Sequence, residues 1–483
     1  MIDALSDDYL GSPEVAACFG AEASCAHMLA FEGALAEAQA ELALIPQAAA
    51  ETIVACAGTL RPDVAQLREQ TVTASNPAIP LVATLTAAVA ASDKGAARYV
   101  HWGATSQDVM DSALMLAART AIEHLDARLR RLEDGLATLA TTHRATPMVA
   151  RTLGQQAGPT TFGLKVAGWL NGLVAAHTRL HALHARLPLQ CGGASGTLAA
   201  FGDDAAGVAE LLAARLGLAS SAPWHTERGI VRELAAAFAE VCAAAGKPAT
   251  DIVLAAQNEI GELAEAAGPG RGGSSAMPHK RNPVAAIAVI ACARRAPGTL
   301  ATVFGCFDHW HERAAGAWHA EAAALAELAT LAGGALAQLE RALDGLEVDT
   351  AAMRRHLESD LGLGMSEAVS MALAPALGRA AAQALVRRAV GSAREQQRPL
   401  GEVLAGMDSV GEHLDAAALA RALDPLAFLG ASGQFIDRAL ARAASLGAGR
   451  PPQASPSAAQ HTTSAAVAGP PVADSHVEEE DDG

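Results

Sequence analysis

Apolar side chains recur every three or four positions between residues 111 and 145, and charged side chains fill the positions between them. The apolar positions are Ile122, Leu125, Leu129, Leu132, Leu136 and Leu139, and the charged ones include Glu123, Asp126, Arg130, Arg131 and Glu133. This spacing is typical of an amphipathic helix with a narrow apolar stripe. No proline interrupts the stretch. We therefore expect a helix of about six or more turns that packs at a shallow angle along neighbouring helices in a bundle.

Three later stretches, residues 162–187, 230–267 and 283–346, are also predicted to form long bundle helices. Alanine and leucine dominate the chain and only 3% of its residues are aromatic. Helix propensity is therefore high, and segments rich in β-branched residues, which favour strands, are scarce. We expect an all-α fold with a long central helix bundle.

Prolines and glycines divide the rest of the chain. The first 112 residues are broken into short helices at Pro13, Pro46, Pro62, Pro77 and Pro80, and short helices return after Gly362-Leu363-Gly364. We expect three helical domains: an N-terminal domain (1–112), a central bundle (113–362) and a C-terminal domain (363–446). Residues 447–483 are rich in Pro, Ala and Ser and end in an acidic run, which predicts a disordered tail.

Charge and cysteine content narrow the partners and the compartment. The formal net charge of -17 argues against nucleic acid and anionic membrane surfaces as partners. No apolar run long enough to span a bilayer is free of Arg, Asp or Glu, and the N-terminal segment is acidic rather than basic, so we expect a soluble cytoplasmic protein. The seven cysteines lack CxxC pairs and are expected to be reduced and mostly buried.

A glycine-rich loop at residues 268–283, Gly-Pro-Gly-Arg-Gly-Gly-Ser-Ser-Ala-Met-Pro-His-Lys-Arg-Asn-Pro, is the most specific feature of the chain. Such a backbone-rich loop can direct successive N–H groups at an anion, and Lys280 and Asn282 add a charge and an amide. Lysine is otherwise rare, since arginine supplies most positive charges. The alternative is a simple glycine-rich connection followed by a basic helix start.

A second cluster of polar residues, His101-Trp102-Gly103-Ala104-Thr105-Ser106-Gln107-Asp108, precedes the first long helix. Thr105, Ser106 and Asp108 are all good N-capping types, and Asp108 could cap the helix. A helix N-terminus that presents hydroxyl and N–H groups could also bind a substrate carboxylate. The two interpretations are compatible.

Together with a third run, residues 151–165 (Arg-Thr-Leu-Gly-Gln-Gln-Ala-Gly-Pro-Thr-Thr-Phe-Gly-Leu-Lys), these motifs resemble those of the fumarase/aspartase superfamily. Its enzymes make or break a bond β to a carboxylate. The resemblance implies Ser274 as proton carrier, with Lys280 and the loop N–H groups stabilising an enediolate-like intermediate. It also implies substrate contacts from His101, Thr105, Ser106, Gln155, Ser275, Met277 and Asn282, and we expect Arg313 to bind a second carboxylate in bidentate fashion.

Leu153 departs from the superfamily's amine-eliminating lyases, in which this position is a histidine that acts as general acid. Leucine transfers no proton, and expelling a poor leaving group without protonation is slow. A carboxylate, whose unperturbed pKa is near ~4, needs no such help. This departure points to the cycloisomerase branch, in which a substrate carboxylate adds across a double bond to close a lactone. Further runs resemble that branch, at residues 191–200, 223–226, 312–313, 318–321 and 345–349.

Two other functions stay open: an adenylosuccinate- or argininosuccinate-type lyase that releases fumarate, and a helical scaffold without activity. The resemblance implies a homotetramer whose active sites each collect the three motifs from different subunits, and the long apolar stripes favour self-association. His177, His181 and His184, and likewise Cys306, His309 and His311, could suggest metal ligands, but neither set has a recognised metal-binding context. We expect packed or solvated imidazoles, no metal and no cofactor.

Overall fold

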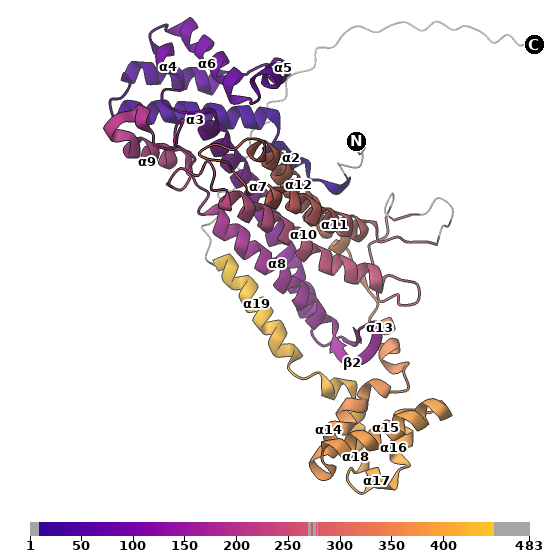
Figure 1. Ribbon diagram of the computed structural model, residues 1–483. Helices are drawn as coiled ribbons and strands as arrows, with labels where there is room; N and C mark the ends of the chain where they lie inside the picture. Colours follow the sequence, from indigo (N-terminus) through magenta and orange to yellow (C-terminus); the bar gives the residue numbers. More distant parts are fainter. Residues whose placement is uncertain (1–8, 269–271, 274–276, 278, 449–483) are drawn as a thin grey trace, which may run out of the picture.

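The computed structural model describes residues 9–268, 272–273, 277 and 279–448, and within them the chain is an elongated assembly of helices (Figure 1). The N-terminal helices gather at one end of a long bundle, and a group of short helices lies at the other. The N-terminal elements are α2 (Pro13–Cys18), α3 (Ala21–Glu41), α4 (Gln47–Thr59), α5 (Val64–Ala74), α6 (Ala78–Ser92) and the 3-10 turn η1 (Ala96–Tyr99).

Five long helices form the bundle: α7 (Ser106–Thr142), α8 (Phe162–His184), α10 (Gly229–Ala255), α11 (Val284–Gly305) and α12 (Ala317–Leu343). The turn η2 (Ala199–Asp204) and the helix α9 (Ala205–Leu216) lie between α8 and α10 in the chain. The predicted apolar stripe of α7 faces the core, because Leu125, Leu129, Leu132 and Leu136 are all 3% exposed or less. The long helix predicted from that stripe is therefore confirmed.

Two of the predicted long helices end earlier than expected. The prediction of a helix over 230–267 is wrong beyond α10, because the chain turns there and Gly261 adopts a φ of 59°. The single helix predicted over 283–346 is also wrong: residues 306–316 separate α11 from α12, and within them His311 and Gly316 have φ values of 48° and 86°. A helix cannot continue through such backbone conformations, which periodicity does not reveal.

A second, smaller core lies beyond the bundle. It is built around Val369, Leu373, Leu385, Val386, Leu400 and Leu404. The elements of this part of the chain are α13 (Thr350–Glu358), η3 (Leu363–Met365), α14 (Ser366–Leu377), α15 (Arg379–Gln396), α16 (Leu400–Ala405), α17 (Asp408–Gly411), α18 (Ala416–Leu423) and η4 (Pro425–Phe428). The last helix, α19 (Ser432–Ala448), returns to lie along α8, and its Ile436 and Ala439 join the large core (Figure 1). Residues 449–483, most of the predicted tail, lie outside the described residues.

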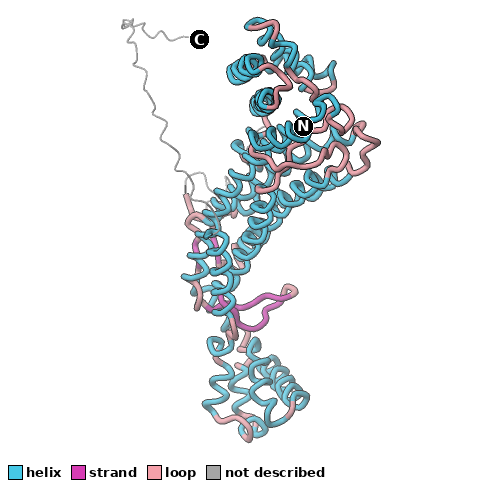
Figure 2. The backbone as a smooth tube through the Cα atoms, turned by 90° about the vertical axis from the view of Figure 1, so that its left-hand side faces the viewer, coloured by secondary structure: helices cyan, strands magenta, loops and turns pink. Residues whose placement is uncertain are grey.

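Two short sheets interrupt the helices. Strands β1 (Pro147–Thr152) and β2 (Gln155–Thr161) form an antiparallel hairpin that projects from the bundle (Figure 2). Its two turn residues, Leu153 and Gly154, have φ values of 52° and 79°, as a tight two-residue hairpin turn requires. The second sheet pairs β3 (Leu263–Ala264) with β4 (Glu347–Val348). Apart from these two short sheets, the regular elements of the described residues are helices, so the predicted all-α fold class is confirmed.

α11 and α12 are long and apolar enough to cross a membrane by length and composition alone. Both nevertheless carry charged residues, including Arg295 and Glu327, which pair with each other at 2.8 Å. α12 packs Leu325, Leu328 and Leu336 into the core. These properties are those of core helices in a bundle.

Candidate functional site

The N-terminus of α7 is held by a capping box between Thr105 and Asp108. Thr105 is the N-cap residue, Ser106 is the first helical residue, and the backbone N–H of Thr105 donates to Oδ2 of Asp108 at 3.1 Å. Asp108 therefore completes the cap from the third helical position. This arrangement leaves the helix N-terminus well ordered and positively polarised.

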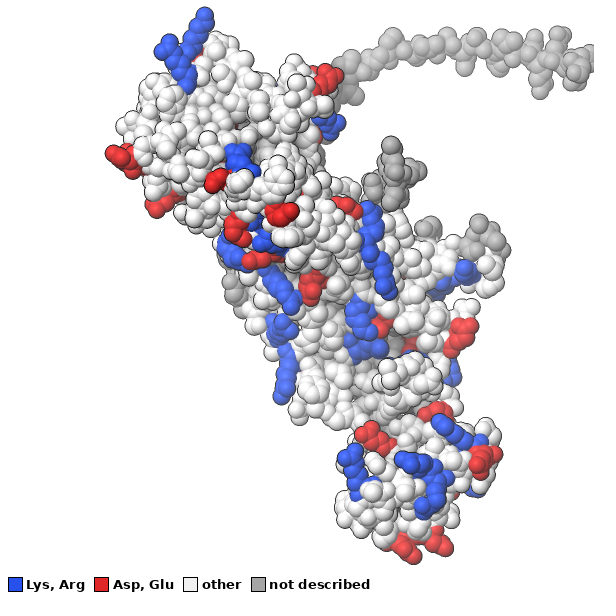
Figure 3. Space-filling view, in the orientation of Figure 1, with Lys and Arg blue, Asp and Glu red and all other residues white. Residues whose placement is uncertain are grey.

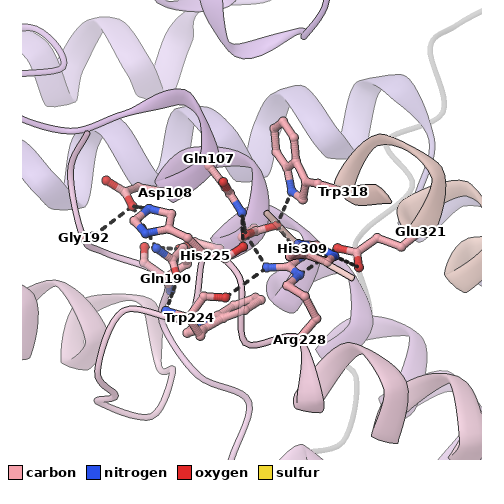
Figure 4. A network of polar contacts seen from close by, with 12 residues as sticks. Gln107, Asp108, Gln190, Gly192, Trp224, His225, Arg228, His309, Trp318 and Glu321 are labelled. Atoms are coloured by element: carbon pink, nitrogen blue, oxygen red, sulfur yellow. Dashed lines mark hydrogen bonds and ion pairs between the residues drawn. The ribbon is translucent and has the colours of Figure 1, made fainter. Parts of the chain in front are cut away.

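Asp108 also ties α7 to the loop that follows α8, as Figure 4 shows. Its carboxylate accepts hydrogen bonds from the backbone N–H groups of Gly192 and Gly193, both at 2.9 Å, and from the Gln190 side chain at 3.1 Å. Nε2 of His225 lies 3.1 Å from Oδ1. Asp108 is fully buried, so each of these contacts helps to offset the cost of removing a carboxylate from water.

His101 precedes the cap and pairs with a buried glutamate. Its φ is 58°, and its Nδ1 lies 2.6 Å from Oε1 of Glu32, a carboxylate that is 1% exposed. Burial lowers the pKa of His101, but the hydrogen bond and negative charge of Glu32, with the charge of Asp108, outweigh it, so the pKa is raised. These contacts favour the protonated form of a partly exposed imidazole, and that form attracts an anion.

Arg313 reaches the same helix end from residues 306–316. Its Nη1 donates to Oγ1 of Thr105 at 3.0 Å. The structure thus brings together three of the predicted site residues, His101, Thr105 and Arg313, beside Ser106. Arg313 is only partly buried, and a guanidinium bonded to a hydroxyl keeps other N–H groups for a carboxylate.

A buried network that sequence analysis missed includes Gln107, the residue after Ser106 in α7, together with Arg228 and Glu321 (Figure 4). Arg228 donates to both oxygens of Asp111, at 2.6 and 2.9 Å, and also to Glu321. Trp318 and Gln107 each donate to Asp111 at 3.0 Å. Burial raises the pKa of Glu321 although Arg228 opposes it. The sequence run at 318–321 resembles the family and contains two members of this network, Trp318 and Glu321. No motif in the sequence around Arg228 or Asp111 indicated that they belong to it.

The glycine-rich loop lies at the other end of the bundle. The backbone N–H of Asn282 donates to the Gly272 carbonyl at 2.9 Å and its side-chain amide donates to the same oxygen at 3.1 Å. A Cβ at Gly272 would lie 2.4 Å from the Asn282 carbonyl oxygen, so only glycine fits there. Met277 and Lys280 are exposed. Ser274 and Ser275 lie outside the described residues.

The stem of this loop is fixed by two further contacts. Arg281 makes a bidentate pair with Glu347 at 2.8 and 3.0 Å. Glu265 accepts from the backbone N–H groups of Ala285 and Ala286 at the start of α11. These contacts of Arg281 and Glu265 anchor the end of the loop where it joins α11, while Lys280 is exposed to solvent.

The hairpin is anchored at this same end of the bundle. Arg151 makes a bidentate pair with the buried Glu262 at 2.8 and 2.9 Å, and Nδ1 of His356 lies 2.7 Å from the same carboxylate. Gln155 and Leu153 lie at the tip, and Leu153 is fully exposed.

The predicted site residues thus fall into two groups within one chain. His101, Thr105, Ser106 and Arg313 surround the N-terminus of α7, whereas Gln155, Met277, Lys280 and Asn282 belong to the hairpin and the glycine-rich loop, whose stems lie near the C-terminal end of α10. α10 begins beside Arg228, which bonds Asp111 near the N-terminus of α7. Its 27 residues correspond to about 40 Å at the rise of an α-helix. A single chain therefore does not bring the two groups together.

The histidines that could suggest a metal site are arranged differently. Nδ1 of His177 lies 2.7 Å from Glu133 and its Nε2 lies 2.6 Å from Asp126, so both nitrogens face carboxylates inside the bundle. Within the described residues, no group of three or more His, Cys, Asp or Glu side chains is arranged to hold a metal ion. All seven cysteines are free thiols, six of them buried.

Comparison with known proteins places these observations in context. Residues 11–298 match the family described as lyase, and residues 362–439 match the adenylosuccinate lyase C-terminus. The chain is 48% identical over 416 residues to 3-carboxy-cis,cis-muconate cycloisomerase of Bradyrhizobium diazoefficiens, covering 86% of this chain and 92% of that protein. It is 44% identical over 445 residues to nitrosuccinate lyase of Streptomyces davaonensis, covering 90% and 94%.

A solved structure is also similar over nearly the whole chain. The crystal structure of 3-carboxy-cis,cis-muconate lactonizing enzyme from Pseudomonas putida superimposes with a TM-score of 0.85 and 41% sequence identity. The match covers 92% of this chain and 100% of that one. The helical architecture described above is therefore shared along essentially its full length.

Proposed function

Because this chain belongs to the lyase family of the fumarase/aspartase superfamily, we propose that it is a 3-carboxy-cis,cis-muconate cycloisomerase, which would serve the degradation of protocatechuate. The substrate class is a small polycarboxylate, and the product is the lactone 4-carboxymuconolactone. The observation that carries the proposal is Leu153 at the position where amine-eliminating relatives hold a general acid, in a chain 48% identical to a cycloisomerase.

The reaction balances without a leaving group. One carboxylate oxygen of the substrate bonds to the carbon β to a second carboxylate. The π electron pair of that double bond moves through the α-carbon onto the second carboxylate, giving an enediolate-like intermediate, and a proton then adds to the α-carbon. In the reverse direction the group expelled is a carboxylate, which needs no proton to leave. A leucine at position 153 is therefore compatible with this chemistry.

The barrier is then set by charge that develops on the second carboxylate. Lys280 and the N–H groups of the glycine-rich loop supply positive charge to it, and Asn282 contributes its amide when its contact to Gly272 opens. Ser274 is assigned as the proton carrier at the α-carbon, and Ser275 and Met277 as substrate contacts. His101, Thr105, Ser106 and Arg313 bind the remaining carboxylates at the N-terminus of α7, and Gln155 contacts the substrate from the hairpin.

We further propose that the active enzyme is a homotetramer with shared sites. The length of α10, about 40 Å for its 27 residues, separates the two groups of site residues, so a complete site needs the α7 N-terminus of one copy beside the loop and hairpin of others. Packing of bundles side by side would supply this arrangement. It would also cover the exposed Leu153 at the hairpin tip.

The experiment follows the conjugated diene of 3-carboxy-cis,cis-muconate in the ultraviolet. Purified protein is expected to remove this absorbance with formation of the lactone, and Ser274→Ala is expected to abolish the reaction. As a control, Ser445→Ala changes a serine of α19 whose hydroxyl only bonds the Arg442 carbonyl, and it should keep wild-type activity. Absence of turnover in a folded wild-type tetramer would refute the proposed function.

A second candidate is elimination from nitrosuccinate, which the 44% identity to nitrosuccinate lyase favours. Nitrite is a weak base, so its departure also requires no general acid at Leu153. Nitrite release from nitrosuccinate, measured colorimetrically with the same protein, separates the two candidates by kcat/KM. Release of fumarate from a succinyl-amine substrate would instead favour the amine-eliminating lyases, and inactivity towards all these substrates would favour a scaffold.

A further inference from the structure

His309, in the segment 306–316 between α11 and α12, is a buried side chain with unmet hydrogen-bonding capacity. Its side chain is 0% exposed, and neither ring nitrogen has a hydrogen-bond partner among the described residues. The Cys306 carbonyl lies nearby but outside hydrogen-bond geometry. The Nε2 atom lies 3.9 Å from Oε2 of Glu321, too far for a hydrogen bond. Because buried polar groups are normally paired, a small shift that closed this gap would be favourable.

Glu321 is suited to receive that contact. Its Oε1 accepts from Arg228, and its Oε2 is the oxygen that faces His309. The charged groups around the imidazole are Arg228, the N-cap residue of α10, Arg232 of α10, Asp111 of α7 and Glu321 of α12. Burial and the Arg228 charge lower the pKa of His309. A neutral imidazole can donate Nε2–H to the carboxylate without adding a charge to the network.

The segment that carries His309 also carries Arg313. His309 points inward to the buried network (Figure 4), whereas Arg313 bonds Thr105 at the N-terminus of α7. Between them Trp310 is 62% exposed and His311 adopts a φ of 48°. A left-handed backbone at a non-glycine residue persists only when surrounding contacts hold it. The position of Arg313 therefore depends on the contacts that the buried side of the segment 306–316 makes.

We propose that His309 is a positioning residue. It binds Glu321, which holds the segment 306–316 in place and thereby positions Arg313 to bind a substrate carboxylate. The hydrogen bond from Nε2 to Oε2 forms as the segment moves inward by about 1 Å, the difference between the present separation and a normal hydrogen bond. The inference rests on the proposed function, since it is that function which assigns a carboxylate to Arg313. His309 itself touches no substrate.

The test compares three substitutions at one position. His309→Leu removes both nitrogens, His309→Gln places an amide N–H at about the reach of Nε2, and His309→Asn reaches only as far as Nδ1. We expect His309→Leu and His309→Asn to raise KM about tenfold or more with little change in kcat, and His309→Gln to restore most of the loss. If His309→Leu does not fold, the two amide variants preserve the comparison. His184→Leu, at a half-buried histidine of α8 that faces Glu123, is the control.

A double-mutant cycle decides whether the effect passes through Arg313. In an Arg313→Ala background, His309→Leu should cause no further rise in KM, whereas independent effects would multiply. Binding of tricarballylate, a small tricarboxylate, measured by calorimetry reports the same contact without turnover. If the wild type lacks turnover but the Kd pattern holds, the proposed function fails and the positioning role stands. If the wild type is active and His309→Leu keeps both KM and Kd, or acts equally without Arg313, the positioning role is overturned.

Discussion

Replacement of Asp108 by asparagine tests how strongly one buried carboxylate organises the N-terminus of α7. The Oδ1 atom accepts from Gln190 and the Gly192 N–H, with His225 3.1 Å away, and Oδ2 accepts from the N–H groups of Thr105 and Gly193. An asparagine has one acceptor oxygen, so its NH₂ group must face donors on one side. Even in the better orientation at least two hydrogen bonds to a charged acceptor are lost.

The magnitude follows from those two bonds. Hydrogen bonds to charged groups contribute about 1.5–3 kcal/mol each, so Asp108→Asn should lower the free energy of unfolding by about 3–6 kcal/mol. The Thr105 N–H is one of the donors left unpaired, so KM should also rise if Thr105 contacts substrate. Urea unfolding at one fixed protein concentration measures the first effect, because oligomer stability depends on concentration. Steady-state kinetics measure the second.

Asp63→Asn is the matched control for this experiment. Asp63 caps the exposed N-terminus of α5 and accepts from the N–H groups of Ala65 and Gln66. Asparagine is about as good an N-cap as aspartate, so this variant should unfold within a few tenths of a kcal/mol of the wild type. If Asp108→Asn were destabilised by no more than the control, the buried carboxylate would not organise the N-terminus of α7.

Three further predictions concern parts of the fold away from α7's N-terminus. His177→Leu leaves Asp126 and Glu133 without the imidazole between them and should lower the free energy of unfolding by about 3–5 kcal/mol in urea titrations; the wild-type value would contradict this. Burial raises the pKa of Glu262, but the hydrogen bonds from Arg151 and His356 outweigh burial, so the pKa is lowered in the folded protein. The stabilisation that Glu262 gives is therefore complete above its unfolded pKa of ~4.3, and it is lost as the pH falls through the pKa of the folded state. Unfolding measured from about pH 6 down to about pH 3 should therefore show a shallower decline for Glu262→Gln than for the wild type, and equal slopes would disprove the assignment. Gly334→Ala would place a Cβ 2.1 Å from the Leu10 carbonyl oxygen and should lower Tm, whereas Gly391→Ala, where nothing lies within 4 Å, should raise stability by up to about 1 kcal/mol; a similar Tm change in both variants would refute the steric argument.

The sequence anticipated features that depend on neighbouring residues. The leucine stripe predicted α7, because residues three and four apart share one face of a helix. The capping types at 105–108 predicted a helix start, although Asp108 acts from the third helical position. The breaks after α10 and after α11 were missed, because left-handed residues such as His311 leave no periodic signal.

The candidate site divides in the same way between sequence and structure. The type of residue at each position, such as Leu153 in place of a proton donor or lysine within the glycine-rich loop, is a property of the sequence and led to the proposed chemistry. The sequence could not predict the partners of Arg228, because Asp111 and Glu321 lie 117 and 93 residues away along the chain.

The sequence by itself therefore determined the long first bundle helix, the family motifs and the chemistry that they favour. Only the tertiary structure decided that Thr105 and Arg313 meet at the N-terminus of α7 while Lys280 and Gln155 belong to segments near the C-terminal end of α10. The physical reason is that a helix is specified by contacts within one or two turns, whereas the meeting of distant segments depends on how whole helices pack and where they end.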